Sequence, residues 1–458
     1  MTEDAHDVTM WSRISLSDSG GLLFRPLERR QCRVRLMCRK LRTDVGPERA
    51  LAVLGARAEK LGLAPPAALC GEWFSSRAVI ALNASLTPVH DVSEAFSIPS
   101  RMPDVRGAVP GAVGGGWFGY LSYDLTDPSG RSGSLPPAAW GWVDRILRLD
   151  ADGTWWFEAL IPDGDPDPVD EVSAVESALT RLPEATTWSS GPLSRPLPSE
   201  HYDAVKACVH AIEAGELFQA NICARFGGRF TGDPIALFAE GVRRLGARRA
   251  AFLAGDWGSV VSFSPELFLA RHGRTVRSTP IKGTLPRRNA ADEHLARRLR
   301  ESTKDVAENV MITDLVRNDL GRVCATGSVR VPELLAVRPA PGVWHLESTV
   351  EGSLADGIDD AALLAATFPP GSVTGAPKIR ALDLIAELEP TARGVYTGAI
   401  GLASPIAGLE LNVAIRTFEI HEDTIALGVG GGITADSDSD AEWQECLHKS
   451  APLERLLG

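Results

Sequence analysis

The sequence lacks any long apolar segment. No uninterrupted apolar run reaches the ~18 residues that a transmembrane helix needs. The N-terminal stretch MTEDAHDVTMWSRIS contains acidic residues and no apolar core of the kind found in a secretory signal. We therefore expect neither a membrane partner nor export.

Paired cysteines and a surplus of positive charge are also absent. The chain has 47 Lys and Arg against 59 Asp and Glu, a net charge of −12, which argues against nucleic acid or an anionic membrane surface as a partner. Its cysteines are odd in number, scattered and never in CxxC spacing, which indicates reduced thiols rather than disulfides or a zinc site. We expect a cytoplasmic location. The seven cysteines are Cys32, Cys38, Cys70, Cys208, Cys223, Cys324 and Cys446.

The remaining composition is that of an ordinary globular protein. The chain has 458 residues, of which 44% are hydrophobic and 23% charged, enough for one large core or for two to three domains. Strand patterns joined by short turns and mixed with helices favour an α+β fold with antiparallel sheets. We predict a poorly ordered arm over residues 1–30, an N-terminal region over 31–160, a linker with one short helix over 161–200, and a catalytic region over 201–458.

Two acidic pairs share the same spacing. Asp305 and Glu308 stand three residues apart in KDVAENVM, and Glu442 and Glu445 do so in DAEWQECLHK. On a helix, residues three apart lie on one face, so each pair projects two carboxylates together. Such carboxylates repel each other unless a cation neutralises them, and four of them with room for waters would suit Mg²⁺. The alternative is that each pair is a solvated helix face.

Lys282 stands in an unusual setting, in the stretch STPIKGTLPRR. It follows Pro280 and Ile281 and precedes Gly283, so its stem is expected to emerge from a turn at the end of a strand. From these residues alone, the position is either a surface loop or a site that holds an amine in a pocket.

Two glycine-rich stretches are candidates for ligand contacts. FPPGSVTGAPKIRAL, residues 368–382, has turns before a helix start and contains Thr374, but it is not a P-loop. GVGGGITADSD, residues 428–438, follows a strand and includes Gly430, Gly431 and Gly432. Consecutive glycines could expose backbone N–H groups as a nest for a carboxylate, or they could form a tight strand-to-helix turn.

Several polar side chains stand among apolar neighbours. Arg416 in NVAIRTF must pair with something if it points inward, and a carboxylate of the protein or of a ligand would fit it. Lys449 in CLHKS is a second cation near a strand end. His345 in VWHLEST and Tyr396 in GVYTGAIG are either satisfied core residues or members of a site.

Together these segments resemble the chorismate-utilising enzyme family, in the family's order and over roughly residues 200 to 455. The resemblance implies a two-lobed α+β body with large antiparallel sheets packed face to face and helices outside. It also implies chorismate, a dianion, as the substrate. The matching segments are SFSPELFL, STPIKGTLPR, KDVAENVMITDLVRNDLGRV, VWHLEST, FPPGSVTGAPKIRAL, YTGAIG, NVAIRT, GVGGGITADSD and EWQECLHK. Upstream of them, GGGWFGYLSYD resembles the glycine-aromatic motif in the N-terminal half of the same proteins.

The resemblance also implies residue roles. Glu308 and Glu445 would ligate Mg²⁺, supported through waters by Asp305 and Glu442. The expected catalytic residues are Lys282 as nucleophile, Glu266 in SFSPELF as general acid, and His345 near the reacting ring. The expected substrate-binding residues are Thr374, Tyr396, Arg416, Gly430, Gly431, Gly432 and Lys449.

Lys282 also distinguishes the branches of the family. Anthranilate synthases typically read P-I-A-G-T here, whereas aminodeoxychorismate synthases read P-I-K-G-T, which this chain resembles. Gln219 stands where isochorismate and salicylate synthases have a lysine base, which argues against water as the attacking group. The alternatives are an anthranilate synthase, a 2-amino-2-deoxyisochorismate synthase, or a non-catalytic regulatory subunit. No glutaminase motif is visible, so ammonia would be taken up free or from a separate glutamine amidotransferase subunit.

Overall fold

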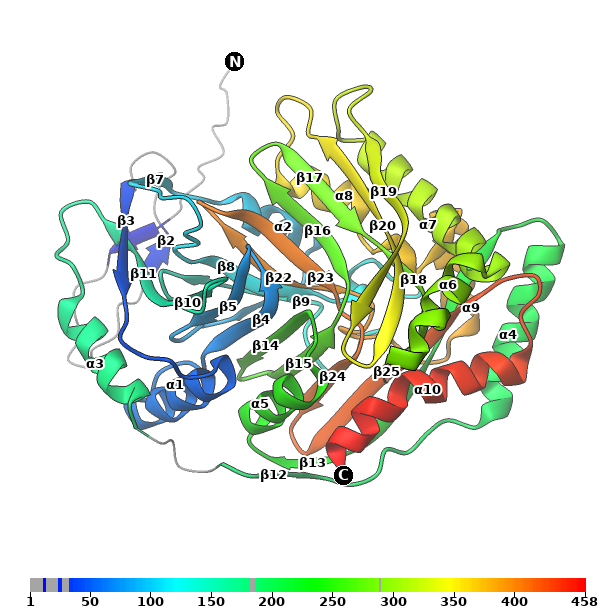
Figure 1. Ribbon diagram of the computed structural model, residues 1–458, viewed down its shortest axis with the longest axis horizontal. Helices are drawn as coiled ribbons and strands as arrows, with labels where there is room; N and C mark the ends of the chain where they lie inside the picture. The colour runs from blue at the N-terminus through cyan, green and yellow to red at the C-terminus, as the bar shows by residue number, and fades with distance from the viewer. Residues whose placement is uncertain (1–10, 14–23, 27–32, 182–185, 288–289) are drawn as a thin grey trace, which may run out of the picture.

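Strands dominate the chain, and most of them join two large sheets (Figure 1). The computed structural model describes residues 11–13, 24–26, 33–181, 186–287 and 290–458. In the larger, 13-stranded sheet of these residues, β3 and β7 form the one parallel pair. Across this sheet the strands are β12 (Trp188–Ser190), β13 (Gln219–Gly232), β25 (Thr424–Ile433), β24 (Thr417–His421), β15 (Gly258–Ser264), β14 (Arg249–Gly255), β4 (Ala67–Trp73), β5 (Ser76–Ala81), β10 (Arg145–Asp150), β11 (Trp155–Pro162), β3 (Arg33–Lys40) and β7 (Asp104–Arg106), with β21 (Gly375–Ala376) paired to β13.

The second sheet has ten strands and carries the Lys282 segment at one end. In order they are β18 (Ile281–Pro286), β20 (Val343–Ser353), β17 (Thr275–Thr279), β16 (Leu267–His272), β23 (Gly408–Val413), β22 (Ala399–Ser404), β8 (Gly116–Leu121), β9 (Ala138–Val143) and β6 (Thr87–Val89), with β19 (Arg330–Ala340) paired to β20. A separate small pair is formed by β1 (Trp11–Arg13) and β2 (Phe24–Pro26).

The two sheets pack face to face around a shared apolar core. Leu69 and Val79 of the 13-stranded sheet belong to the same buried cluster as Phe118, Tyr120 and Ile400 of the 10-stranded sheet. Alternation of side chains along each strand sends every second residue into this layer, and the opposite faces are then free to bind helices. The predicted α+β architecture, with antiparallel sheets face to face and helices outside, is confirmed.

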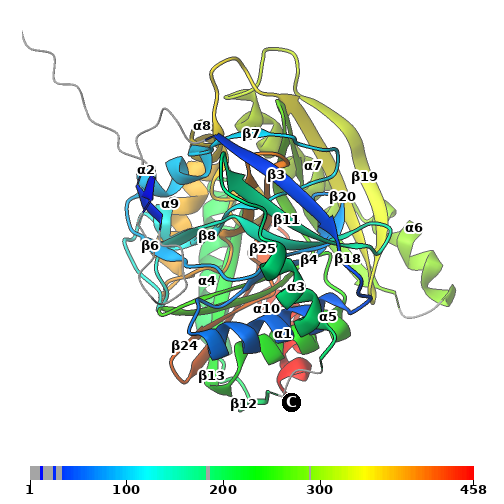
Figure 2. The ribbon, with the colours of Figure 1, turned by 90° about the vertical axis from the view of Figure 1, so that its left-hand side faces the viewer.

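Helices cover the outer faces of both sheets. Views at right angles show α1 and α5 side by side against the larger sheet (Figures 1 and 2). The helices on that face are α1 (Pro47–Leu61), α3 (Val169–Leu179), α5 (Pro234–Leu245) and α10 (Ser439–Leu457). Those on the 10-stranded sheet are α2 (Val92–Ser97), α7 (Thr303–Gly321) and α8 (Asp360–Thr367), while α4 (Pro198–Glu213) and α9 (Lys378–Leu388) pack against the start of β13 and α6 (Glu293–Glu301) lies beside β18. Short 3₁₀ turns are η1 (Ile98–Ser100), η2 (Tyr123–Thr126), η3 (Ala290–Asp292) and η4 (Gly371–Val373).

The segment predicted as a linker, residues 161–200, contains α3 and β12 in its described part. Strands from before and after it share both sheets: β4 pairs with β14, and β8 pairs with β22. The two regions on either side of this segment therefore share one body. Apart from β1 and β2, the arm predicted over residues 1–30 lies outside the described residues.

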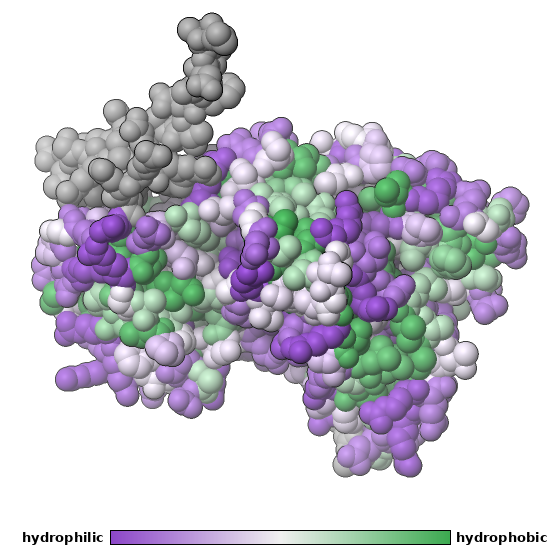
Figure 3. Space-filling view, turned by 90° about the horizontal axis from the view of Figure 1, so that it is seen from above, coloured by the Kyte–Doolittle hydropathy of each residue, from purple (hydrophilic) through white to green (hydrophobic). Residues whose placement is uncertain are grey.

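The surface is mixed in character. Seen from above, hydrophilic side chains are spread over the molecule and hydrophobic ones form smaller separate patches (Figure 3). Among the described residues, no helix is both long enough and apolar enough to cross a membrane.

Candidate active site

The two acidic pairs lie at the N-terminal ends of two different helices. Asp305 is in the first turn of α7, where Ser302 caps the helix by accepting a hydrogen bond from the Asp305 N–H. Glu442 is in the first turn of α10, which Asp438 caps in the same way. Helix N-termini stabilise negative charge, which explains why carboxylates are tolerated here at low exposure.

Lysines accompany these carboxylates. Lys282 Nζ lies 3.9 Å from Glu308 Oε2, and Lys449 Nζ lies 2.7 Å from Glu445 Oε1. Burial raises the pKa of Glu308 despite the nearby lysines. Burial, the largest single influence, would raise the pKa of Glu445, but Lys449, Lys304 and Lys282 together outweigh it and the pKa is lowered. Glu308, Glu442 and Glu445 thus each have a lysine partner, and the side chain of Glu445 is also 45% exposed.

The lysines beside these carboxylates would have to move before the carboxylates could bind a hard cation. Within the described residues, no three His, Cys, Asp or Glu side chains converge as a ready-made metal centre. Glu442 Oε2 is nevertheless buried without a hydrogen-bond partner, and a Cβ on Gly431 would lie 3.1 Å from it. Mg²⁺ is commonly held by one or two carboxylates together with waters and substrate oxygens, so this donor set fits it.

Lys282 is held inside the protein by a bulge in β18. Gly283 has φ of 92°, a conformation that favours glycine, and the register with β20 shifts at this point. Bulges re-aim side chains beside active sites, and this one accompanies the burial of the Lys282 side chain, which is 9% exposed. Burial lowers the pKa of its amine, with Glu308 opposing the shift. The surface-loop interpretation of Lys282 is therefore wrong, because its side chain is buried.

The Lys282 amine is next to Gln219 and Gly432. A Cβ on Gly432 would lie 2.5 Å from Gln219 Nε2 and 2.9 Å from Lys282 Nζ, so glycine leaves the room that both side chains occupy. Neither polar atom of the buried Gln219 amide has a hydrogen-bond partner in the described part of the chain. A buried amide without partners usually awaits a ligand or water.

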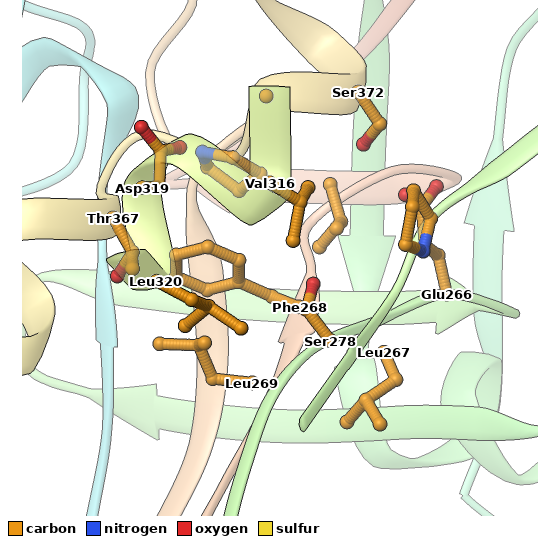
Figure 4. Close-up of a pocket in the computed structure, with 14 residues that line it drawn as sticks. Glu266, Leu267, Phe268, Leu269, Ser278, Val316, Asp319, Leu320, Thr367 and Ser372 are labelled. Carbon is orange, nitrogen blue, oxygen red and sulfur yellow. The ribbon is translucent and has the colours of Figure 1, made fainter. Parts of the chain in front are cut away.

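Glu266 lies between β15 and β16 and is 3% exposed. Burial raises its pKa to about 7, although a hydrogen bond from Ser372 and the charge of Lys282 oppose the shift. Glu266 and Ser372 line a cavity of about 10 Å³, which is the size of one water. Figure 4 shows Glu266 and Ser372 on one side of it and Asp319 and Thr367 on the other. A carboxyl group with this pKa can hold or release a proton near neutral pH.

Arg416 lies where the chain passes from one sheet to the other, between β23 and β24. Its φ is 52°, unusual for a residue with a side chain, and its carbonyl accepts a hydrogen bond from the Phe263 N–H. Burial lowers the pKa of the guanidinium, opposed by the charge of Glu266. No hydrogen bond or ion pair of this side chain is found among the described residues. Of the two partners considered from the sequence, a carboxylate of the protein is thus not found among these residues.

His345 is buried on β20, and its Nδ1 lies 3.0 Å from Thr284 Oγ1. Burial, together with Arg416 and Arg248, lowers its pKa to about 3, so the imidazole is neutral near pH 7. Its Nε2 has no partner within the parts of the chain that are described. A neutral imidazole with one free nitrogen can exchange a hydrogen bond with a ligand.

Other expected binding residues lie nearby but are turned toward the protein. The Thr374 hydroxyl bonds within its own turn, 3.1 Å from Pro370 O. Tyr396 interacts with Cys223, its ring would touch a Cβ on Gly428, and burial raises its pKa well above the usual value. In the described chain, neither side chain has a bond with Arg416.

The glycine run does not form the predicted nest or turn. Gly430, Gly431 and Gly432 belong to β25 and pair in regular antiparallel register with Cys223, Ile222 and Asn221 of β13. None of the three has positive φ, which a nest of alternating conformations requires. Their function in the fold is to leave space for the side chains around them. Lys449 Nζ donates to Gly430 O at 2.8 Å.

Comparison with known proteins identifies the family of this chain. The family described as chorismate binding enzyme matches residues 73–455, more than half of the chain. The chain belongs to the chorismate-binding enzyme family. It is 39% identical over 346 residues to aminodeoxychorismate synthase component 1 of Salmonella typhimurium, covering 73% of this chain and 75% of that protein.

Two further relatives of this chorismate-binding enzyme show the breadth of the family. Anthranilate synthase component 1 of Streptomyces coelicolor is 36% identical over 368 residues, covering 73% of this chain and 71% of that protein. The crystal structure of anthranilate synthase component I from Streptococcus pneumoniae superposes with a TM-score of 0.71 at 25% identity, covering 82% of this chain and 92% of that one.

Two residues of the site were missed by sequence reasoning. Lys304 lies one helical turn before Glu308 and contacts the acidic cluster, and its i,i+4 spacing could have signalled this. Ser372 reaches Glu266 from η4, which lies more than a hundred residues further along the chain. No local pattern marks such a contact. In this chorismate-binding enzyme, the charged environment of the site is thus richer than the motifs alone suggested.

Proposed function

We propose that the chain is component I of an aminodeoxychorismate synthase, which converts chorismate and ammonia to 4-amino-4-deoxychorismate and water. The observation that carries this proposal is the burial of the Lys282 amine beside Glu308, Gln219 and Gly432. An amine in such a place can attack a bound substrate, whereas an exposed lysine would be protonated and solvated.

Charge complementarity supports chorismate as the substrate. Arg416 has a guanidinium without a protein partner in the described chain, which suits the enolpyruvyl carboxylate. Glu308 and Glu445 would hold Mg²⁺, which when bound supplies a positive anchor for the ring carboxylate and draws electron density from the ring. Lys449, Tyr396, Thr374 and the glycines of β25 are the remaining proposed substrate contacts, for which Thr374 and Tyr396 would turn away from their contacts within the protein.

The residues then divide the reaction into two displacements. The Lys282 amine forms a bond to ring C2 while the double bonds shift and the C4–O bond breaks. Glu266 gives its proton to the departing hydroxide, which leaves as water. Ammonia next forms a bond to C4, the C2–N bond to lysine breaks, and Glu266 takes up the surplus proton. His345 stays neutral and can hold the ring substituent by a hydrogen bond.

The name component 1 of the Salmonella protein implies a second subunit for that protein. We propose that a separate glutamine amidotransferase supplies ammonia here as well, and that the chain acts in the cytoplasm. The product would serve either folate synthesis or a specialised pathway built on para-aminobenzoate or para-aminophenylalanine. The relatives named as anthranilate synthases keep the C2 amination open as an alternative.

The test is a product assay by mass spectrometry with chorismate, Mg²⁺ and ammonium. The wild type and Lys206→Ala, an exposed lysine on α4, should form aminodeoxychorismate. Lys282→Ala should lose at least about a thousandfold in rate while it keeps its melting temperature within a few degrees. Without ammonium, the wild type but not this variant should gain the mass of chorismate less water. Anthranilate as the wild-type product would refute the proposed branch.

A further inference from the structure

Lys304 joins the two helices that bear the acidic pairs. It lies on α7, its Nζ donates a hydrogen bond to Glu442 Oε1 of α10 at 3.1 Å, and it lies 4.0 Å from Glu308 Oε1. Ser437 Oγ donates to the same Glu442 oxygen at 2.6 Å. A single ammonium thus spans one carboxylate from each acidic pair.

The carboxylates are arranged around ammonium groups rather than around one metal position. Lys304, Lys282 and Lys449 each face at least one of the glutamates, whereas no three carboxylates converge within the described residues. Buried carboxylates without counter-charge would repel each other. The lysines therefore supply the positive charge that keeps this cluster together.

The three lysines differ in how easily each ammonium group can move away from the acidic cluster. The side chain of Lys282 is 10% exposed. That of Lys449 is 45% exposed, but two short contacts hold its Nζ, one to Glu445 Oε1 at 2.7 Å and one to Gly430 O at 2.8 Å. The side chain of Lys304 is 49% exposed, and its contacts, at 3.1 Å to Glu442 and 4.0 Å to Glu308, are longer and are both with carboxylates of the cluster. A half-exposed lysine can swing its ammonium into water by rotation about its flexible stem.

We propose that Lys304 is an internal counter-cation of the acidic cluster, which a divalent cation displaces when it binds. This inference rests on the proposed Mg²⁺ site. In the metal-free protein, the ammonium of Lys304 on α7 links the two helices by its ion pair with Glu442 on α10. When a metal ion is bound, the metal links the carboxylates of the two helices instead. The ammonium therefore lowers the apparent affinity for metal while it stabilises the empty site.

The test measures Mg²⁺ binding by calorimetry on metal-stripped protein without chorismate. Lys304→Met should bind Mg²⁺ roughly tenfold more tightly than the wild type, because a competing charge is removed. Lys206→Met, which removes an exposed lysine of α4, should bind as the wild type does. In EDTA the melting temperature of Lys304→Met should fall by a few degrees, and saturating Mg²⁺ should abolish the difference.

Different outcomes overturn different parts of the reasoning. Equal or weaker Mg²⁺ binding by Lys304→Met, with normal binding by the wild type, overturns the counter-cation role and leaves the proposed function intact. No Mg²⁺ binding by the wild type overturns the proposed metal and this inference with it. Lys304→Arg keeps the charge and should bind Mg²⁺ no more tightly than the wild type, so tighter binding by this variant also counts against competition.

Discussion

Replacement of Glu266 by glutamine tests the electrostatics of the site directly. Burial raises the pKa of this carboxyl from 4.5 to about 7. The folded protein thus holds the proton more tightly than the unfolded chain does. The resulting stability is fully present below pH 4.5 and is lost as the pH rises through 7. Glutamine has no proton to lose, so Glu266→Gln should gain stability relative to the wild type only as the pH rises.

The size of the effect follows from the shift. A pKa change of about 2.5 units corresponds to roughly 3 kcal/mol at pH 8, and the 3% exposure of Glu266 leaves little solvent screening. The entropy of unfolding of a 458-residue chain is about 1 kcal/mol per kelvin. Glu266→Gln should therefore melt about 3 °C above the wild type at pH 8 and about 1 °C or less above it at pH 5.

The assay is thermal denaturation of metal-stripped protein at both pH values, with Glu59→Gln on the exposed face of α1 as control. The turnover of Glu266→Gln should fall although its melting temperature rises, because glutamine cannot protonate the leaving hydroxide. A melting difference that is equal at pH 5 and pH 8 would refute the argument, since it would show that the carboxyl does not titrate between them.

Two further substitutions probe the substrate walls. Arg416→Met removes a partly buried guanidinium without a described partner, so the melting temperature should hold or rise while the KM for chorismate increases by about a hundredfold. A fall in melting temperature would reveal a structural role instead. Gly432→Ala places a Cβ 2.5 Å from Gln219 Nε2 and 2.9 Å from Lys282 Nζ. Both atoms are the far ends of flexible side chains, so the variant should lower kcat by about a hundredfold by displacing the amine, with little change in stability. Gly191→Ala, which meets no atom within 4 Å, should leave kcat unchanged.

Local patterns predicted the helices of the site well. The three-residue spacing placed Asp305 and Glu308 on one helix and Glu442 and Glu445 on another, as α7 and α10 show. Periodicity and capping depend on neighbours in sequence, so such elements can be predicted without the fold. The strand pattern likewise gave the antiparallel α+β class.

Environments set by distant segments could not be predicted in this way. The burial of Lys282 depends on β20 and on Gly432, which lie far along the chain. The glycine run of β25 reads as a turn by local propensity, yet pairing with β13 makes it a strand. Arg416 has no side-chain partner among the residues that the structure describes, and this too is a property of the assembled sheets, because any of many carboxylates could have reached it.

The position of β24 and β25 has a consequence for synthesis on the ribosome. These strands follow all other strands of both sheets in the chain, yet they fill the gap between β13 and β15 in the 13-stranded sheet. Until they emerge, β13 and β15 keep unpaired edges that invite pairing with other chains. The nascent chain therefore passes through a long aggregation-prone stage, during which chaperones that shield strand edges would raise the yield of folded enzyme.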